Sequence, residues 1–147
     1  MLVAEVLLDT PRPADELVTL PFEVRQKSRF RTTLDSGREL LVRLPHGTQL
    51  RHGALLGASD GVVIEVRAAA ETLSVVECSD PHLLSRAAYH LGNRHIPLQI
   101  DPGRLSYQHD HVLDDMLRKL GLTPTVEQRP FEPEAGAYGA HGSVHAH

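Results

Sequence analysis

The sequence predicts an α+β protein with three consecutive parts, and three observations support this division. Residues 1–69 contain short apolar and β-branched stretches separated by turn residues, without a sustained helical period, which indicates a small all-β domain. Residues 70–133 contain two stretches with the apolar spacing of a helix among shorter strand-like stretches. Residues 134–147 contain several glycines and show no periodicity, so we expect a flexible tail.

The all-β domain begins with a predicted strand at residues 2–8. A hairpin is expected next, with strands at 30–34 and 39–44 on either side of Asp35-Ser36-Gly37-Arg38. Gly37 favours this turn because glycine tolerates the positive φ that tight hairpin turns require. Two further strands are expected at 48–51 and 62–67, with Asp60-Gly61 as a turn between them.

The second domain begins with a predicted strand at 72–78, followed by a helix. Asp80 is the expected N-cap of this helix and Pro81 its first residue. Apolar residues then follow at the i, i+3, i+4, i+7 spacing of one helix face, and Gly92 is the expected C-terminal cap. These apolar residues are Leu84, Ala87, Ala88 and Leu91.

Two short strands, 97–100 and 104–107, are joined by Asp101-Pro102-Gly103, which is typical of a type I or II turn. A second helix ends at Gly121, and a last strand covers 125–128. The second helix presents Leu113, Met116, Leu117 and Leu120 on one face. The resulting order βαββαβ predicts a ferredoxin-like domain. Each half has only about 65 residues and a small core, so we expect association between copies.

Composition excludes several classes of function. The net charge is −4, which argues against nucleic acid as a partner because phosphate binding needs clustered Lys and Arg. There is also no Trp, and three Phe and three Tyr are too few for a surface on which bases stack. No apolar run approaches the ~20 residues that cross a bilayer, so we expect no membrane association. The first residues lack the basic region of a signal peptide, and the single Cys78 fits a reducing compartment, so we expect a cytoplasmic protein.

Histidine is unusually frequent, with ten residues, and imidazole is the commonest metal ligand. Three of them, His141, His145 and His147, lie in the last seven residues. The densest group of possible ligands lies at the end of the first predicted helix, just after it, and at the start of the second helix. It consists of His90, His95, His109, Asp110 and His111.

His109 and His111 are two positions apart and would point about 200° away from each other within a helix. They would therefore need a cap or extended conformation to hold one ion, and they are equally explained as solvated residues at the helix start. From the residues alone, His95 is more simply explained as a loop histidine satisfied by the backbone. One imidazole is not a metal site, so a metal at His95 would need ligands from the tail or from a second copy across a two-fold axis.

Other polar residues have simpler explanations. Cys78 is expected to be a small buried apolar residue rather than a ligand. The pair Asp114-Asp115 is expected to be solvated at the helix N-terminus. Since no phosphate-binding loop, nucleophile elbow or His-Glu-x-x-His is present, we expect the protein not to be an enzyme. The competing enzyme hypothesis is a metal-dependent hydrolase that uses His109, Asp110 and His111.

Three stretches together resemble a known family. They are Tyr89-His90-Leu91-Gly92-Asn93-Arg94-His95, then Tyr107-Gln108-His109-Asp110-His111-Val112-Leu113-Asp114-Asp115-Met116-Leu117, and Pro130-Phe131-Glu132-Pro133-Glu134-Ala135-Gly136-Ala137-Tyr138-Gly139 before the histidine-bearing tail. The combination resembles the UreE-type urease accessory proteins, which are nickel metallochaperones. The resemblance covers the whole chain in order and is strongest over residues 82–139.

This resemblance implies a peptide-binding-like β domain and a ferredoxin-like metal-binding domain, assembled as a homodimer. It implies nickel delivery to the urease apoprotein complex through the urease GTPase. His95 matches the histidine that meets its two-fold mate at the principal site, and His109 and His111 match an accessory pair. The tail histidines His141, His145 and His147 match extra ligands, although three are few for storing many ions.

Nickel itself follows only from the resemblance, because imidazole sites also accept Zn²⁺ and Cu²⁺. The alternative is a generic zinc- or copper-binding protein, or a protein-interaction module, without a role in nickel delivery.

Overall fold

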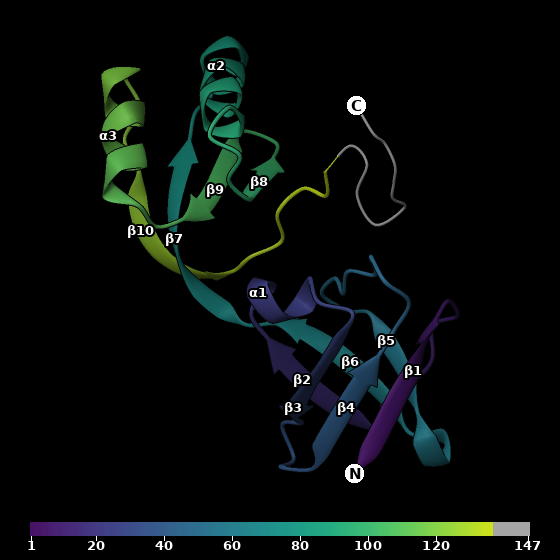
Figure 1. The fold of residues 1–147 in the computed structure, drawn as a ribbon. Helices are drawn as coiled ribbons and strands as arrows, with labels where there is room; N and C mark the ends of the chain where they lie inside the picture. Colours follow the sequence, from purple (N-terminus) through teal and green to yellow (C-terminus); the bar gives the residue numbers. More distant parts are fainter. Residues whose placement is uncertain (137–147) are drawn as a thin grey trace. The chain divides into compact units, whose positions relative to one another are not determined.

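A computed structural model of the chain describes residues 1–136, and these form an α+β protein, as predicted (Figure 1). The chain divides into two compact units, one built on Met1–Ala69 and the other on Ala70–Glu134. Each unit has its own sheet and its own hydrophobic core. No helix among the described residues is long and apolar enough to cross a membrane.

The first unit is a six-stranded mixed sheet with one short helix. The strand order is β2-β6-β5-β1-β4-β3. The elements are β1 (Leu2–Leu8), β2 (Glu16–Leu20), α1 (Phe22–Arg25), β3 (Arg29–Thr33), β4 (Glu39–Arg43), β5 (Leu55–Ala58), the 3₁₀ turn η1 (Ser59–Gly61) and β6 (Val63–Ala68). The pairs β1–β4 and β2–β6 are parallel, so strands distant in sequence close this unit.

The predicted hairpin is confirmed, because β3 and β4 pair antiparallel and Gly37 adopts a φ of 98° in the connecting turn. The expected strand at 48–51 is wrong. The Leu50 amide donates to the Arg25 carbonyl at 2.9 Å, and the Leu50 carbonyl accepts from the Arg25 side chain at 3.2 Å. This segment therefore satisfies its backbone on Arg25 and not on a neighbouring strand.

Arg25 is the largest fully buried polar residue of the first unit, with 1% of its surface exposed. Its Nε donates to the Leu20 carbonyl at 3.0 Å, in addition to the bond from its Nη1 to the Leu50 carbonyl. A buried guanidinium is tolerated only where its donors are paired. Arg25 thus connects the end of β2, helix α1 and the segment before β5.

The second unit is a four-stranded antiparallel sheet with two helices, in the order expected from the sequence. Its strand order β10-β7-β9-β8 and its βαββαβ sequence are those of a ferredoxin-like fold. The elements are β7 (Ala70–Glu77), α2 (Pro81–Gly92), β8 (Leu98–Asp101), β9 (Arg104–Gln108), α3 (His111–Lys119) and β10 (Thr125–Pro130). Figure 1 shows α2 and α3 on the same side of this sheet.

Side chains from both helices and from the covered face of the sheet form the core of the second unit. Its buried members are Val76, Ala87, Leu91, Leu98, Leu105, Tyr107, Leu113, Leu117 and Leu122. Strand register places Ser74 opposite Tyr107, and Val76 opposite Leu105. Because side chains alternate between the two faces of a strand, these four point to the helix-covered face. Two of the four, Ser74 and Tyr107, carry hydroxyl groups, and both are completely buried.

Capping explains where the helices begin. The Asp80 carboxylate accepts from the His82 and Leu83 amides at the start of α2, as predicted. Gly92, however, does not end α2 in a left-handed conformation. It is the last helical residue, the chain continues in turn conformation through Asn93 and Arg94, and His95 takes the left-handed position with a φ of 58°. Gly121 does take that position after α3, with a φ of 98°.

Candidate metal centre

His95 lies at the end of the turn that follows α2. Its amide donates to the Gly92 carbonyl at 3.0 Å, and its side chain is exposed. A φ of 58° is uncommon for a residue with a β-carbon, for which left-handed geometry costs roughly 1–2 kcal/mol. The backbone therefore presents this imidazole to solvent from a conformation that glycine would adopt without strain.

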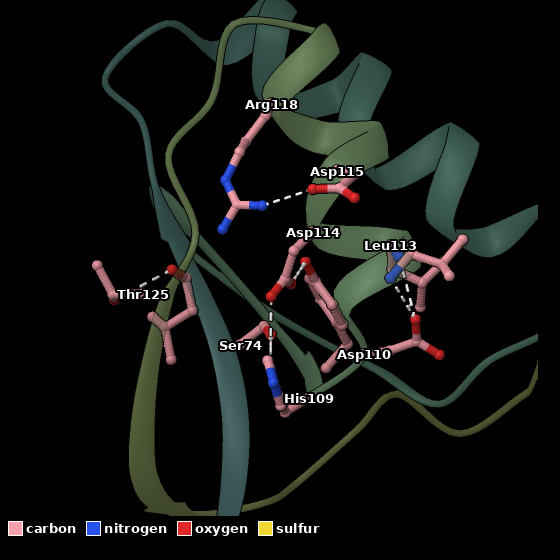
Figure 2. Close-up of polar contacts among 11 residues, drawn as sticks. Ser74, His109, Asp110, Leu113, Asp114, Asp115, Arg118 and Thr125 are labelled. Carbon is pink, nitrogen blue, oxygen red and sulfur yellow. Dashed lines mark hydrogen bonds and ion pairs between the residues drawn. The ribbon is translucent and has the colours of Figure 1, made fainter.

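His109 lies between the end of β9 and the start of α3, and its side chain turns toward the sheet. The backbone amide donates to the Thr72 carbonyl at 3.1 Å. Nδ1 of the ring lies 3.0 Å from the Ser74 hydroxyl and 3.3 Å from Oδ2 of Asp114. Figure 2 shows these contacts as dashed lines. The side chain remains 39% exposed. The ring is thus held at Nδ1, while part of the side chain stays exposed.

Asp114 is almost fully buried, with 2% of its surface exposed, so the expectation that Asp114 is solvated is wrong. Its Oδ1 accepts from the hydroxyl of Tyr107 at 2.5 Å, while Oδ2 faces His109. Asp115 does fit the expectation, because its side chain is 62% exposed and bonds Arg118. Its position in the first turn of α3, next to the apolar Leu113, explains why Asp114 points inward and Asp115 outward.

Tyr107 is completely buried on β9. Burial raises the pKa of its phenol well above the usual range, and the hydrogen bond to Asp114 acts in the same direction. A side-chain hydrogen bond with Ser74 and the charge of Arg118 act the other way and are smaller. The phenol therefore stays protonated and acts as a donor to the carboxylate.

Asp110 and His111 have different roles from His109. The Asp110 carboxylate is the N-cap of α3 and accepts from the Val112 amide at 2.8 Å and from the Leu113 amide at 3.1 Å. His111 is the first residue of α3, and its side chain is exposed. The two histidines thus do not share a helix, and their environments differ: His109 is tied to buried groups and His111 faces solvent.

A small pocket connects the segment after His95 with the surroundings of His109. It has a volume of about 160 Å³. Its lining residues are Ile96, Pro97, Gln108, His109, Asp110 and Leu113. The residues that directly follow His95 therefore line the same pocket as His109.

No group of three or more His, Cys, Asp or Glu side chains that could hold a metal ion occurs within residues 1–136. His141, His145 and His147 lie outside the described residues. Cys78, which was not expected to be a ligand, is partly buried against the core of the second unit. A complete site with His95 or His109 would thus need donors beyond those that the described part of one copy brings together.

Two family models match the chain in succession. The N-terminal domain of the UreE urease accessory protein matches residues 4–69, and the C-terminal domain of the same protein matches residues 71–147. The chain belongs to the UreE family of urease accessory proteins. The predicted resemblance is therefore confirmed.

Individual UreE proteins match over most of their length. The urease accessory protein UreE of Alkalilimnicola ehrlichii is 60% identical over 139 residues, which cover 95% of this chain and 85% of that protein. UreE of Pseudomonas putida strain GB-1 is 65% identical over 122 residues, covering 82% and 74%. UreE of Citrobacter koseri is 52% identical over 150 residues, covering 100% and 99%.

Membership in the UreE family assigns the chain an accessory, chaperone role in urease maturation. The family is non-enzymatic, which confirms the expectation that the protein is not an enzyme and removes the hydrolase hypothesis. The sequence alone singled out His95, His109 and His111 but missed Ser74, Tyr107 and Asp114. The only available signal was the placement of Asp114 one residue from Leu113, on the flank of an apolar helix face.

Proposed function

We propose that this chain is a nickel metallochaperone that binds Ni²⁺ through histidines at a homodimer interface and delivers it for assembly of the urease active site. The observation that carries the proposal is the geometry of His95. Its imidazole is exposed on a left-handed backbone, which is a strained state for histidine. Residues with a strained backbone concentrate at functional sites, where the surrounding structure maintains the strain because the side chain has a function.

A two-fold axis close to His95 would supply the second imidazole that one copy lacks. In a two-fold interface the same residues of both copies meet, so one exposed histidine becomes a pair. The absence of a complete ligand group within residues 1–136 of one copy is consistent with a site that two copies share. His109 and His111 would be accessory ligands, and His141, His145 and His147 would supply further donors from the tail.

Imidazole ligands suit a protein that must release its ion. A site of histidines with open coordination positions exchanges ligands more readily than a closed site of four thiolates. Such a site would also accept Zn²⁺ and Cu²⁺, and Cu²⁺ has the highest intrinsic affinity of the three. Selection of nickel would then depend on which metal the cell supplies.

The partners follow from the same proposal. The recipient would be the urease apoprotein complex, reached through the urease GTPase accessory protein, in the cytoplasm. The first unit would contribute a peptide-binding-like surface to such contacts. The net charge of −4 offers no basis for a nucleic-acid partner.

The test is a calorimetric nickel titration of the metal-free protein, with oligomer mass measured in parallel. Intact protein is expected to bind about one tightly held ion per dimer, because one His95 pair forms one site. His95→Ala should lose this binding, whereas His46→Ala, an exposed histidine of the first unit, should retain it. Unchanged binding in His95→Ala would refute the shared site.

The alternative is a zinc- or copper-binding protein or an interaction module without nickel delivery. It is distinguished by combining His95→Ala with removal of residues 137–147. If that double variant binds nickel as the intact chain does, the histidines at these positions are incidental. If binding is lost but the variant still supports urease activation in cells, nickel delivery is not the function.

A further inference from the structure

The polar side chains of Ser74, Tyr107, His109 and Asp114 form one connected group under α3, here called the Asp114 cluster. We infer that Asp114 is a positioning residue: it holds the His109 ring with its proton on Nδ1, so that Nε2 presents a free electron pair outward to a metal. The inference rests on the proposed role of His109 as an accessory ligand, and it adds a residue that acts through that ligand.

The inventory of donors and acceptors around the ring favours one tautomer. An ionised carboxylate has only acceptor sites, and Oδ1 of Asp114 already accepts from Tyr107. Oδ2 faces Nδ1 of His109 at 3.3 Å, so the attraction requires a proton on that nitrogen. A neutral imidazole carries a single N–H, and Nε2 is therefore left with its electron pair available.

The opposite tautomer would be unfavourable at this place. It would direct the lone pair of Nδ1 at the oxygen of a buried carboxylate, and it would leave Oδ2 without a donor. Buried acceptors without a donor are costly, and the penalty is larger for charged groups. The Ser74 hydroxyl, 3.0 Å from Nδ1, can share the Nδ1 proton but cannot remove the conflict with Oδ2.

The cluster is rigidly supported from several elements. Asp114 lies in the first turn of α3, where its amide donates to the Asp110 carbonyl at 2.9 Å. Ser74 and Tyr107 are direct partners on β7 and β9. His109 is anchored by its backbone on Thr72 and by its ring on Asp114, so both ends of the residue are constrained.

Neighbouring charged groups do not compete for this contact. The Asp110 carboxylate is engaged by the first amides of α3, and the Arg118 guanidinium bonds Asp115 at 2.7 Å. His109 also lines the pocket that contains Ile96 and Pro97. The arrangement is that of a carboxylate–histidine–metal triad, in which the outer carboxylate orients the ligand and raises its basicity.

The test uses metal-free, uniformly ¹⁵N-labelled full-length protein and long-range ¹H–¹⁵N spectra of the histidine rings. The His109 ring is assigned by its loss in His109→Ala. We expect wild-type His109 to be protonated at Nδ1. Asp114→Asn should change the tautomer population of His109, because an amide can also donate to Nδ1. Asp115→Asn, the adjacent exposed position, should leave it unchanged.

A wild-type ring protonated at Nε2 would overturn the inference, even if Asp114→Asn failed to fold. An unchanged tautomer in a folded Asp114→Asn variant would overturn it as well. Tyr107→Phe provides a second variant, because it keeps the carboxylate against Nδ1. Its His109 ring is expected to remain protonated at Nδ1, and a switch to Nε2 would assign the control to Tyr107 instead.

Nickel titrations of the same variants separate this inference from the proposed function. Asp114→Asn should weaken the His109-dependent affinity by about 10- to 100-fold relative to Asp115→Asn, as is typical when a partner of a ligating histidine is removed. It should have no further effect in a His109→Ala background. If the tautomer follows Asp114 but His109→Ala binds nickel normally, the positioning stands and the ligand role of His109 is refuted.

Discussion

Replacement of His95 tests whether its left-handed backbone is strained, independently of its imidazole. The informative comparison is between His95→Gly and His95→Ala, because both variants remove the ring. Alanine keeps the β-carbon that clashes at a φ of 58°, whereas glycine adopts this conformation freely. The side chain of His95 is exposed, so neither variant loses much packing.

The magnitude follows from two opposing effects. Relief of the left-handed conformation favours glycine by roughly 1–2 kcal/mol. The greater freedom of glycine in the unfolded chain opposes this by about 0.4–1 kcal/mol. We therefore expect His95→Gly to be more stable than His95→Ala by about 1 kcal/mol. In a domain of roughly 60–100 residues, that difference raises Tm by about 4–8 °C.

Urea unfolding of the metal-free protein measures this difference. All three tyrosines, Tyr89, Tyr107 and Tyr138, follow residue 70 and there is no Trp, so tyrosine fluorescence reports mainly on the second unit. Both variants should lose tight nickel binding. If His95→Gly is no more stable than His95→Ala, the backbone at this position is not strained in solution, and strain cannot support a functional role for His95.

Three further predictions concern buried groups. Tyr107→Phe should destabilise the protein by about 1.5–3 kcal/mol in urea unfolding, because Asp114 loses its donor. The control Tyr89→Phe, at an exposed position, should change the stability by no more than about 0.5 kcal/mol. Equal effects of the two substitutions would refute the hydrogen bond between Tyr107 and Asp114. In an alkaline titration followed by tyrosinate absorbance, Tyr107 should ionise last, since its pKa is raised in the folded state. Wild-type stability should accordingly fall as the pH rises above about 10, where the unfolded phenol ionises, and the same slope in Tyr107→Phe would contradict this. Arg25→Met should destabilise the first unit by about 1–3 kcal/mol in thermal unfolding, because the buried Leu50 carbonyl loses its side-chain donor, whereas the Leu20 carbonyl keeps the Ala69 amide. No change in Tm would show that water replaces the guanidinium.

The second unit was predicted closely because its signals are local. Both helices have an apolar stripe with a capping aspartate before it, and the 101–103 turn contains Pro102 and Gly103, with a φ of 72° at Gly103. The first unit was predicted only in part. Strands β2 and β5 were missed because they are short and lack clear alternation, and β5 has the sequence Leu-Leu-Gly-Ala. Their pairing with β6 depends on contacts that local patterns do not encode.

The candidate site shows the same limit. Histidines stand out in a sequence, so His95 and His109 could be named without a structure. Asp114 could not, because an acidic residue in the first turn of a helix is usually solvated and stabilised by the helix dipole. Its burial depends on Tyr107 lying opposite Ser74 on neighbouring strands, and that register appears only once the sheet is assembled.

The strand order of the second unit has a consequence for synthesis and for the design of truncations. Strand β7, made first, lies between β9 and β10, and β10 is made last. Until Pro130 has left the ribosome, β7 has an open edge beside the apolar side chains of Leu73 and Val75, which is the kind of edge that recruits other chains. A nascent chain is thus most prone to aggregate shortly before this sheet is complete.

The segment that follows β10 limits how far the chain can be shortened from its C-terminal side. The Glu134 amide still donates to the Leu98 carbonyl at 2.8 Å, and Phe131 is fully buried. Removal of the histidine-bearing tail should therefore begin after residue 136. A cut only a few residues earlier would remove support from β8, and one inside β10 would expose β7 permanently.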